Sequence, residues 1–152
     1  SPEMTPPPTA CVKTFACREA LGLIWLKTGD DDADGLSALA ADHDIAESPL
    51  FCKSIYVDGT YDTLIDRLQN SADAKFECSE LAPGLISATV TPGDAAGESL
   101  IIGVQICSQT RLALHIVVKS VGEQNEDDLR RLHYGKWAQR LRWQLNQTEA
   151  QT

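Results

Sequence analysis

Four polar residues, three of which could ligate a metal, lie within nine positions near the middle of the chain. They are Asn70, Asp73, Glu77 and Cys78. Carboxylate and thiolate groups are metal ligands, and the metal they select depends on how many of each are brought together. The segment is therefore a candidate metal site, and the rest of the chain must be read for elements that would position it.

A short helix is predicted directly before these polar residues. Tyr61, Leu64, Ile65 and Leu68 have the spacing that places one apolar stripe on a helix. Thr60 precedes them and is the predicted cap. The stretch Asp58–Cys78 is thus expected to present its polar end from a helix anchored by its apolar face.

Other familiar sites are weakly indicated or missing from the sequence. The acidic run 29–35 lacks the spacing of a calcium-binding loop and is interpreted as a solvated acidic loop. His43, His115 and His133 have no ligand spacing, and His115 is expected to be a structural residue in an apolar strand. No nucleophile elbow, phosphate-binding loop or dinucleotide-binding glycine motif occurs.

Length and charge restrict the protein class. The 152 residues suffice for one domain with a substantial core, and the formal net charge of −9 argues against a nucleic-acid surface. No apolar run is long enough to cross a bilayer, and no secretory leader opens the sequence. The five widely spaced cysteines indicate thiols, most of them buried, in a reducing, cytoplasmic compartment rather than disulfides.

The order of predicted elements indicates an α+β fold with an antiparallel sheet covered by helices. Strands are expected at Val12–Phe15, Leu21–Leu26, Phe51–Val57, Leu85–Val90, Ser99–Cys107 and Arg111–Val121, and a short helix at Leu36–Glu47. The last two strands are expected to form a hairpin.

A long helix is predicted after the polar turn Gly122–Asp128. Its apolar stripe is expected to comprise Leu129, Leu132, Trp137, Leu141 and Leu145. Its outer face would be basic, through Arg130, Arg131, Lys136, Arg140 and Arg142. This basic face either pairs with the chain's own acidic loops or docks a partner.

Three stretches, taken in order, resemble the catalytic domain of Rieske-type non-haem iron oxygenases, the ring-hydroxylating alpha subunits. The first runs from Pro6 through Val12–Phe15 to Gly22–Leu26 and Gly29–Asp30, the second is Tyr61–Cys78, and the third joins Ser108–Arg111 to Asn125–Asp127. The second stretch is similar to the family's iron-ligand helix. The resemblance implies a helix-grip, START-like fold in which a curved sheet wraps a long C-terminal helix.

The resemblance also implies a set of ligand positions, at which this chain departs from the family. The family motif D-x-x-H-x-x-x-x-H reads here as Asn70, Asp73 and Cys78, so the bridging acid and both histidines are replaced. Asp127 stands at the position of the third, carboxylate ligand. The implied metal ligands are Asp73, Cys78 and Asp127, which would bring up to three negative charges to Fe(II).

Three hypotheses follow from the resemblance. The chain is an oxygenase catalytic domain with altered iron binding, a START-like module that binds an apolar small molecule, or a structural subunit of an oxygenase assembly or homo-oligomer. Residues 1–10 would be a proline-rich linker or truncated edge, residues 11–146 the domain, and residues 147–152 a tail. No ligands for a 2Fe–2S cluster are present, and no nucleic-acid or membrane partner is expected.

Overall fold

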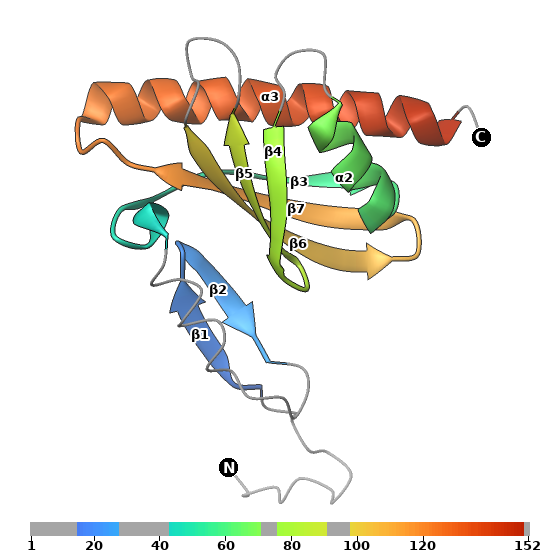
Figure 1. Cartoon of the computed structure of the whole chain (residues 1–152), viewed down its shortest axis with the longest axis horizontal. Helices are drawn as coiled ribbons and strands as arrows, with labels where there is room; N and C mark the ends of the chain where they lie inside the picture. Colours follow the sequence, from blue (N-terminus) through green and yellow to red (C-terminus); the bar gives the residue numbers. More distant parts are fainter. Residues whose placement is uncertain (1–14, 28–42, 71–75, 91–97, 151–152) are drawn as a thin grey trace, which may run out of the picture.

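The computed structural model describes residues 15–27, 43–70, 76–90 and 98–150 (Figure 1). Its elements are β1 Cys17–Ala20, β2 Leu23–Leu26, the 3-10 helix η1 Asp44–Ala46, β3 Pro49–Asp58, α2 Tyr61–Gln69, β4 Phe76–Ala82, β5 Leu85–Val90, β6 Ser99–Ser108, β7 Arg111–Lys119 and α3 Gln124–Ala150. Within these ranges, no helix combines the length and apolarity that a bilayer crossing requires.

Five of the described strands form one antiparallel sheet in the order β3-β7-β6-β5-β4. Strands β4 to β7 form a meander, and β3, the first of the five in sequence, pairs with the last, β7. Helix α3 lies across one face of this sheet, with α2 beside it (Figure 1). This arrangement confirms the predicted α+β class and its helix-grip architecture.

The main core lies between α3 and the sheet. Strand β7 is apolar on both faces, so its alternate residues enter two different cores: Leu114 and Ile116 face α3, and Val117 faces away from it. A strand covered on both sides is mostly apolar along its length, and this pattern predicts the strand at 111–121. Helix α3 contributes Tyr134, Trp137, Ala138, Leu141 and Leu145 to this core, and we call these residues its inner face.

The opposite face of the sheet is partly covered by the β1–β2 hairpin and η1. Leu21 and Ile45 pack there against Leu85, Ile101 and Val117. The predicted strand Leu21–Leu26 is confirmed over Leu23–Leu26, which is β2, but its first two residues form a turn, with φ of 55° at Leu21 and 72° at Gly22. Two successive positive φ angles match the turn that joins two-residue hairpins.

Gly103 allows the hairpin to approach the sheet closely. A Cβ atom at this position of β6 would lie 2.9 Å from Leu23 Cδ1, too close for an ordinary contact. Trp25, beside Leu23, donates from its indole nitrogen to the carbonyl of Ala20 at 2.9 Å and so holds the hairpin closed.

Two N-terminal predictions fall largely outside the described residues. The predicted strand Val12–Phe15 is described only at Phe15, which belongs to no strand. Of the predicted helix Leu36–Glu47, the described part is a 3-10 turn at Asp44–Ala46, and β3 begins at Pro49.

The orientation of α3 differs from the prediction. Leu129 and Leu132 were expected to face the core, but they are 64% and 54% exposed. Tyr134, at 2% exposure, takes their place. At about 100° per residue, Leu129 and Leu132 lie on the side of the helix opposite to Leu141, so the predicted stripe merged two different faces. The helix also continues to Ala150, so the tail predicted to begin at residue 147 starts as helix.

Candidate functional site

The predicted metal positions begin at the end of α2. Thr60 caps this helix as predicted: its side chain accepts from the Thr63 amide, and Thr63 Oγ1 accepts from the Thr60 amide at 2.9 Å. At the other end, Asn70 donates from its side-chain nitrogen to the carbonyl oxygen and to Oδ1 of Asp66, at 3.0 and 2.9 Å. Asn70 therefore closes its own helix, and its amide is turned toward Asp66.

Cys78 lies on strand β4, not on a helix. The expectation of one ligand helix over Tyr61–Cys78 is wrong, because α2 ends at Gln69 and the chain is a strand from Phe76. The Cys78 side chain packs against the main core, and burial raises the pKa of its thiol. A thiol must lose its proton to bind a metal, so this environment opposes ligation. Asp73 lies outside the described residues.

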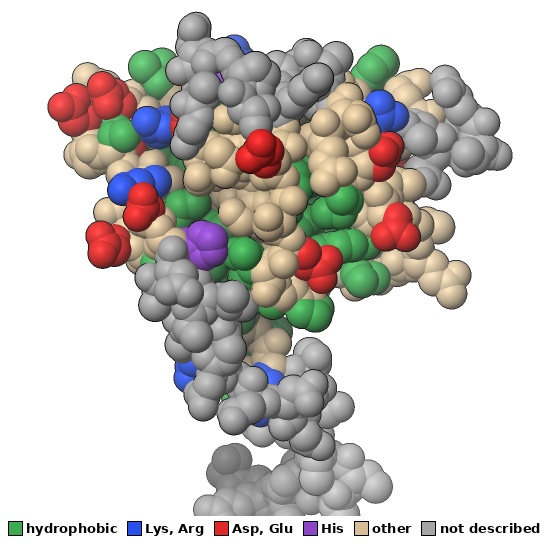
Figure 2. Space-filling model, in the orientation of Figure 1, with side chains coloured by type: hydrophobic (Ala, Val, Ile, Leu, Met, Phe, Trp, Pro, Cys, Tyr) green, Lys and Arg blue, Asp and Glu red, His purple; other side chains and the backbone are tan. Residues whose placement is uncertain are grey.

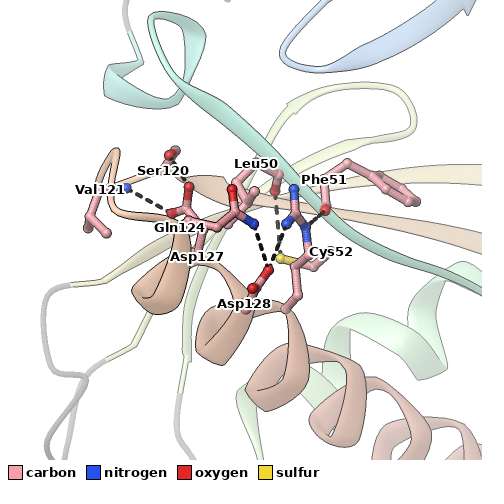
Figure 3. Close-up of polar contacts among 9 residues, drawn as sticks. Leu50, Phe51, Cys52, Ser120, Val121, Gln124, Asp127 and Asp128 are labelled. Carbon is pink, nitrogen blue, oxygen red and sulfur yellow. Dashed lines mark hydrogen bonds and ion pairs between the residues drawn. The ribbon is translucent and has the colours of Figure 1, made fainter.

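Asp127 lies in the first turn of α3, where it binds the preceding turn. Its carboxylate accepts from Ser120 Oγ at 2.6 Å and from the Val121 amide at 3.1 Å (Figure 3). The Ser120 hydrogen bond, followed by the Val121 amide, holds the pKa of Asp127 below its usual value. The side chain thus joins the end of β7 to the start of α3.

The structure separates Cys78 from Asp127. Phe76 begins β4 against Trp137, with ring centroids 5.1 Å apart. Trp137 lies ten residues beyond Asp127, a rise of about 15 Å along the helix. Ligands of one metal lie about 2–2.6 Å from it, so these two groups do not form a shared site. In the described part of the chain, no three acidic, histidine or cysteine side chains are grouped as metal ligands would be.

A different polar group, missed by the sequence analysis, lies at the N-terminal half of α3. Arg130 forms an ion pair with Glu98, which directly precedes β6. Both side chains are largely buried, at 27% and 22% exposure. The only sequence signal for this group was Tyr134, which lies three residues before Trp137 and seven before Leu141, on the same helical face.

The hydroxyl of Tyr134 lies beside this ion pair. The Tyr134 hydroxyl lies close to the Glu98 carboxylate, but neither it nor Arg130 Nε forms a hydrogen bond of ordinary geometry with a described residue, although both atoms are buried. Burial, followed by the nearby Glu98 carboxylate, raises the pKa of Tyr134 well above its usual value. Burial likewise raises the pKa of the neighbouring Cys52 thiol to about 11. These neutral groups fit a structural anchor better than a nucleophilic centre.

The side of α3 that points away from the sheet forms a separate surface. Leu129, Leu132, Lys136, Gln139 and Trp143 recur at spacings of three and four residues, and we call them the outer face of α3. Trp143 is 65% exposed and lies nine residues after the buried Tyr134, about two and a half helical turns further on. A shallow groove of about 340 Å³ lies along this face, lined by Lys136, Gln139, Arg140 and Trp143.

The segment of α3 that carries the outer face has a charge opposite to that of the rest of the chain, although only Lys136 of its basic residues lies on the outer face itself. Residues 129–148 hold five basic and no acidic side chains. The remaining sequence has eight basic against 22 acidic residues, a net charge of −14. Figure 2 shows acidic side chains spread across the view, with apolar side chains between them in the middle of the molecule.

Comparisons of this chain with protein-family models, curated proteins and solved structures find no match. The oxygenase resemblance therefore stays a prediction. Of what it implies, the structure agrees with the fold class alone.

Proposed function

We propose that this chain is a non-catalytic helix-grip domain that binds another protein through the outer face of α3. The observation that supports this proposal is the exposure of Leu129, Leu132 and Trp143 in helical register, on a side of α3 that none of the described elements covers. Large apolar residues that line one exposed helical face, bordered by charged residues, are typical of protein interfaces. The predicted structural-subunit role is the closest of the three hypotheses.

The environment of the ligand positions also favours a non-catalytic role. The Asp127 carboxylate is engaged with Ser120 and Val121, and the raised pKa of Cys78 disfavours the thiolate. These described residues do not fit a shared iron site. The interface between α3 and the sheet is lined by side chains that are almost fully buried, which favours a packed core there over a small-molecule pocket.

A photo-crosslinking amino acid at Gln139 tests this function in the cells that produce the protein. We expect a crosslinked protein product from position 139 and none from Glu77, an exposed position on β4. Trp143→Ser should abolish the product. Ile106→Ser, which removes an equally exposed apolar residue from β6, should leave it unchanged. Equal products from positions 139 and 77, or a product insensitive to Trp143→Ser, would refute the proposal.

The Rieske-type oxygenase hypothesis is a second candidate, because an antiparallel sheet packed against a long C-terminal helix is the fold that the resemblance implied. Anaerobic addition of Fe(II) to the purified chain, followed by metal analysis, tests it separately. Stoichiometric iron that is lost in both Asp73→Ala and Cys78→Ala would restore a catalytic role. We also propose a reducing, cytoplasmic location, in keeping with the free thiols at Cys17, Cys52, Cys78 and Cys107.

A further inference from the structure

We infer that the partner segment is an acidic amphipathic helix, which lies along α3 as the second strand of a short coiled coil. This inference rests on the proposed protein-binding function and adds the chemistry and geometry of the partner.

The spacing of the outer face is that of a coiled-coil seam. Leu129, Lys136 and Trp143 recur every seven residues, and Leu132 and Gln139 lie three residues after the first two of them. These are the a and d positions of a heptad, which a partner helix contacts directly. The core of this protein uses the other side of α3, so the seam has no role in the described fold.

The charges beside this seam specify the sign of the partner. Arg140 and Arg142 occupy the e and g positions, which flank a seam and select partners by charge. Arg130 already pairs with Glu98. Arg131 already pairs with Asp128 and donates to the Phe51 carbonyl. Lys136 and Arg142, in contrast, form no ion pair with a described residue. Glutamates on a partner helix would complete these pairs.

A second copy of this chain fits the seam less well. A symmetric dimer places the same surface on both sides, so the basic residues Lys136, Arg140 and Arg142 of one copy would face a surface with the same basic residues on the other. Like charges held this close oppose association. The Lys136 and Gln139 positions also break the apolar seam at its centre, which disfavours a strong homodimer and fits a polar, charge-matched partner.

A nucleic acid fits less well for a different reason. The basic residues of segment 129–148 are confined to one helix, and the net charge of −14 on the rest of the chain repels a long polyanion. A narrow acidic helix contacts only α3 and also buries Leu129, Leu132 and Trp143.

Binding of designed peptides to the full chain tests the inference. The probe is an acidic peptide of about three heptads, with Leu at the a and d positions and Glu at the e and g positions. One control peptide carries Lys at the e and g positions, and a second has the acidic composition in scrambled order. Calorimetry measures the affinity and stoichiometry, and the Trp143 indole resonance reports the contact.

We expect 1:1 binding of the acidic peptide, with both control peptides at least about tenfold weaker. Lys136→Glu/Arg142→Glu should weaken the acidic peptide about tenfold and improve the Lys peptide, because the charges that select the partner are reversed. The matched variant Lys27→Glu/Lys119→Glu makes the same change in net charge elsewhere and should behave as the wild type. Circular dichroism checks that each variant is folded.

The remaining outcomes separate this inference from the proposed function. Equal affinity for all three peptides, or no effect of Lys136→Glu/Arg142→Glu, overturns the acidic helix. A wild-type dimer that Trp143→Ser converts to a monomer also overturns it, but leaves the outer face as a protein-binding surface. If no peptide binds while Gln139 still crosslinks to a protein, the partner chemistry is wrong and the function stands. If neither occurs, both proposals fail.

Discussion

The two faces of α3 are built from similar residues, but one is buried against the sheet and the other is exposed to solvent. The inner face places Tyr134, Trp137 and Leu141 against the sheet with almost no exposure. The outer face presents Leu132 and Trp143 to solvent. Both faces contain a tryptophan and leucines at helical spacing, so the residue types alone do not reveal which face supports the fold. Their surroundings do, because only the inner face meets complementary apolar side chains on the strands.

Trp137→Ala should produce the largest loss of stability. The indole is buried between Phe76 and Tyr134, with ring centroids 5.1 and 6.4 Å away. Removing it leaves a cavity that should lower the free energy of unfolding by about 3–5 kcal/mol. Urea unfolding followed by circular dichroism measures the change. Where Trp137→Ala fails to fold, Trp137→Phe provides a milder variant, and a loss below about 0.5 kcal/mol in both would contradict the described core.

The fold class was predictable because its strands are strongly patterned. Strands β5, β6 and β7 are runs of β-branched and aliphatic residues bounded by turns, and their pairing follows from short connections. Strand β4 was not predicted because its first five residues include the polar Glu77, Ser79 and Glu80. A mostly polar segment lacks the apolar run by which the other strands were recognised. An edge strand with one partner tolerates such composition.

The orientation of α3 and the polar anchor were harder to predict, for physical reasons. When a helix has apolar residues on two faces, its sequence alone does not show which face packs against the core. The predicted stripe combined Leu132 and Leu141, which lie on opposite sides of α3. The contact between Glu98 and Arg130 joins residues 32 positions apart. No local pattern encodes it, since it depends on how the sheet and the helix meet.

Glu98→Gln should cause the next largest effect, at the border between the two faces. The substitution leaves the Arg130 guanidinium largely buried without its counter-charge, which should cost about 1–3 kcal/mol of unfolding free energy. Tyr134→Phe is the matched variant: it removes a buried hydroxyl that forms no hydrogen bond of ordinary geometry and should change stability by less than about 1 kcal/mol. A larger loss in Tyr134→Phe than in Glu98→Gln would show that the hydroxyl, not the ion pair, anchors the helix.

The Asp127 carboxylate should have a smaller, pH-dependent effect on the free energy of unfolding. Its pKa in the folded chain lies below the ordinary 3.8, so its stabilising contribution is complete above 3.8 and is lost as the pH falls through the lower folded value. Unfolding free energies measured from about pH 5 down to about pH 2 should therefore decline less steeply in Asp127→Asn than in the wild type. Identical slopes for the two proteins would mean that the Ser120 and Val121 contacts do not persist in solution.

Trp143→Ser should have the smallest effect on stability, and this near-absence of effect is what distinguishes the outer face. A tryptophan that is 65% exposed contributes little to the folded core, so its loss should alter the free energy of unfolding by less than about 0.5 kcal/mol. Single exposed apolar residues are common on protein surfaces, so the double variant Leu132→Ser/Trp143→Ser is the stricter measurement. If the double variant also unfolds like the wild type while the crosslink from Gln139 disappears, the outer face serves binding alone. A loss above about 1 kcal/mol would instead mean that this face stabilises the fold, and the two faces of α3 would no longer differ in kind.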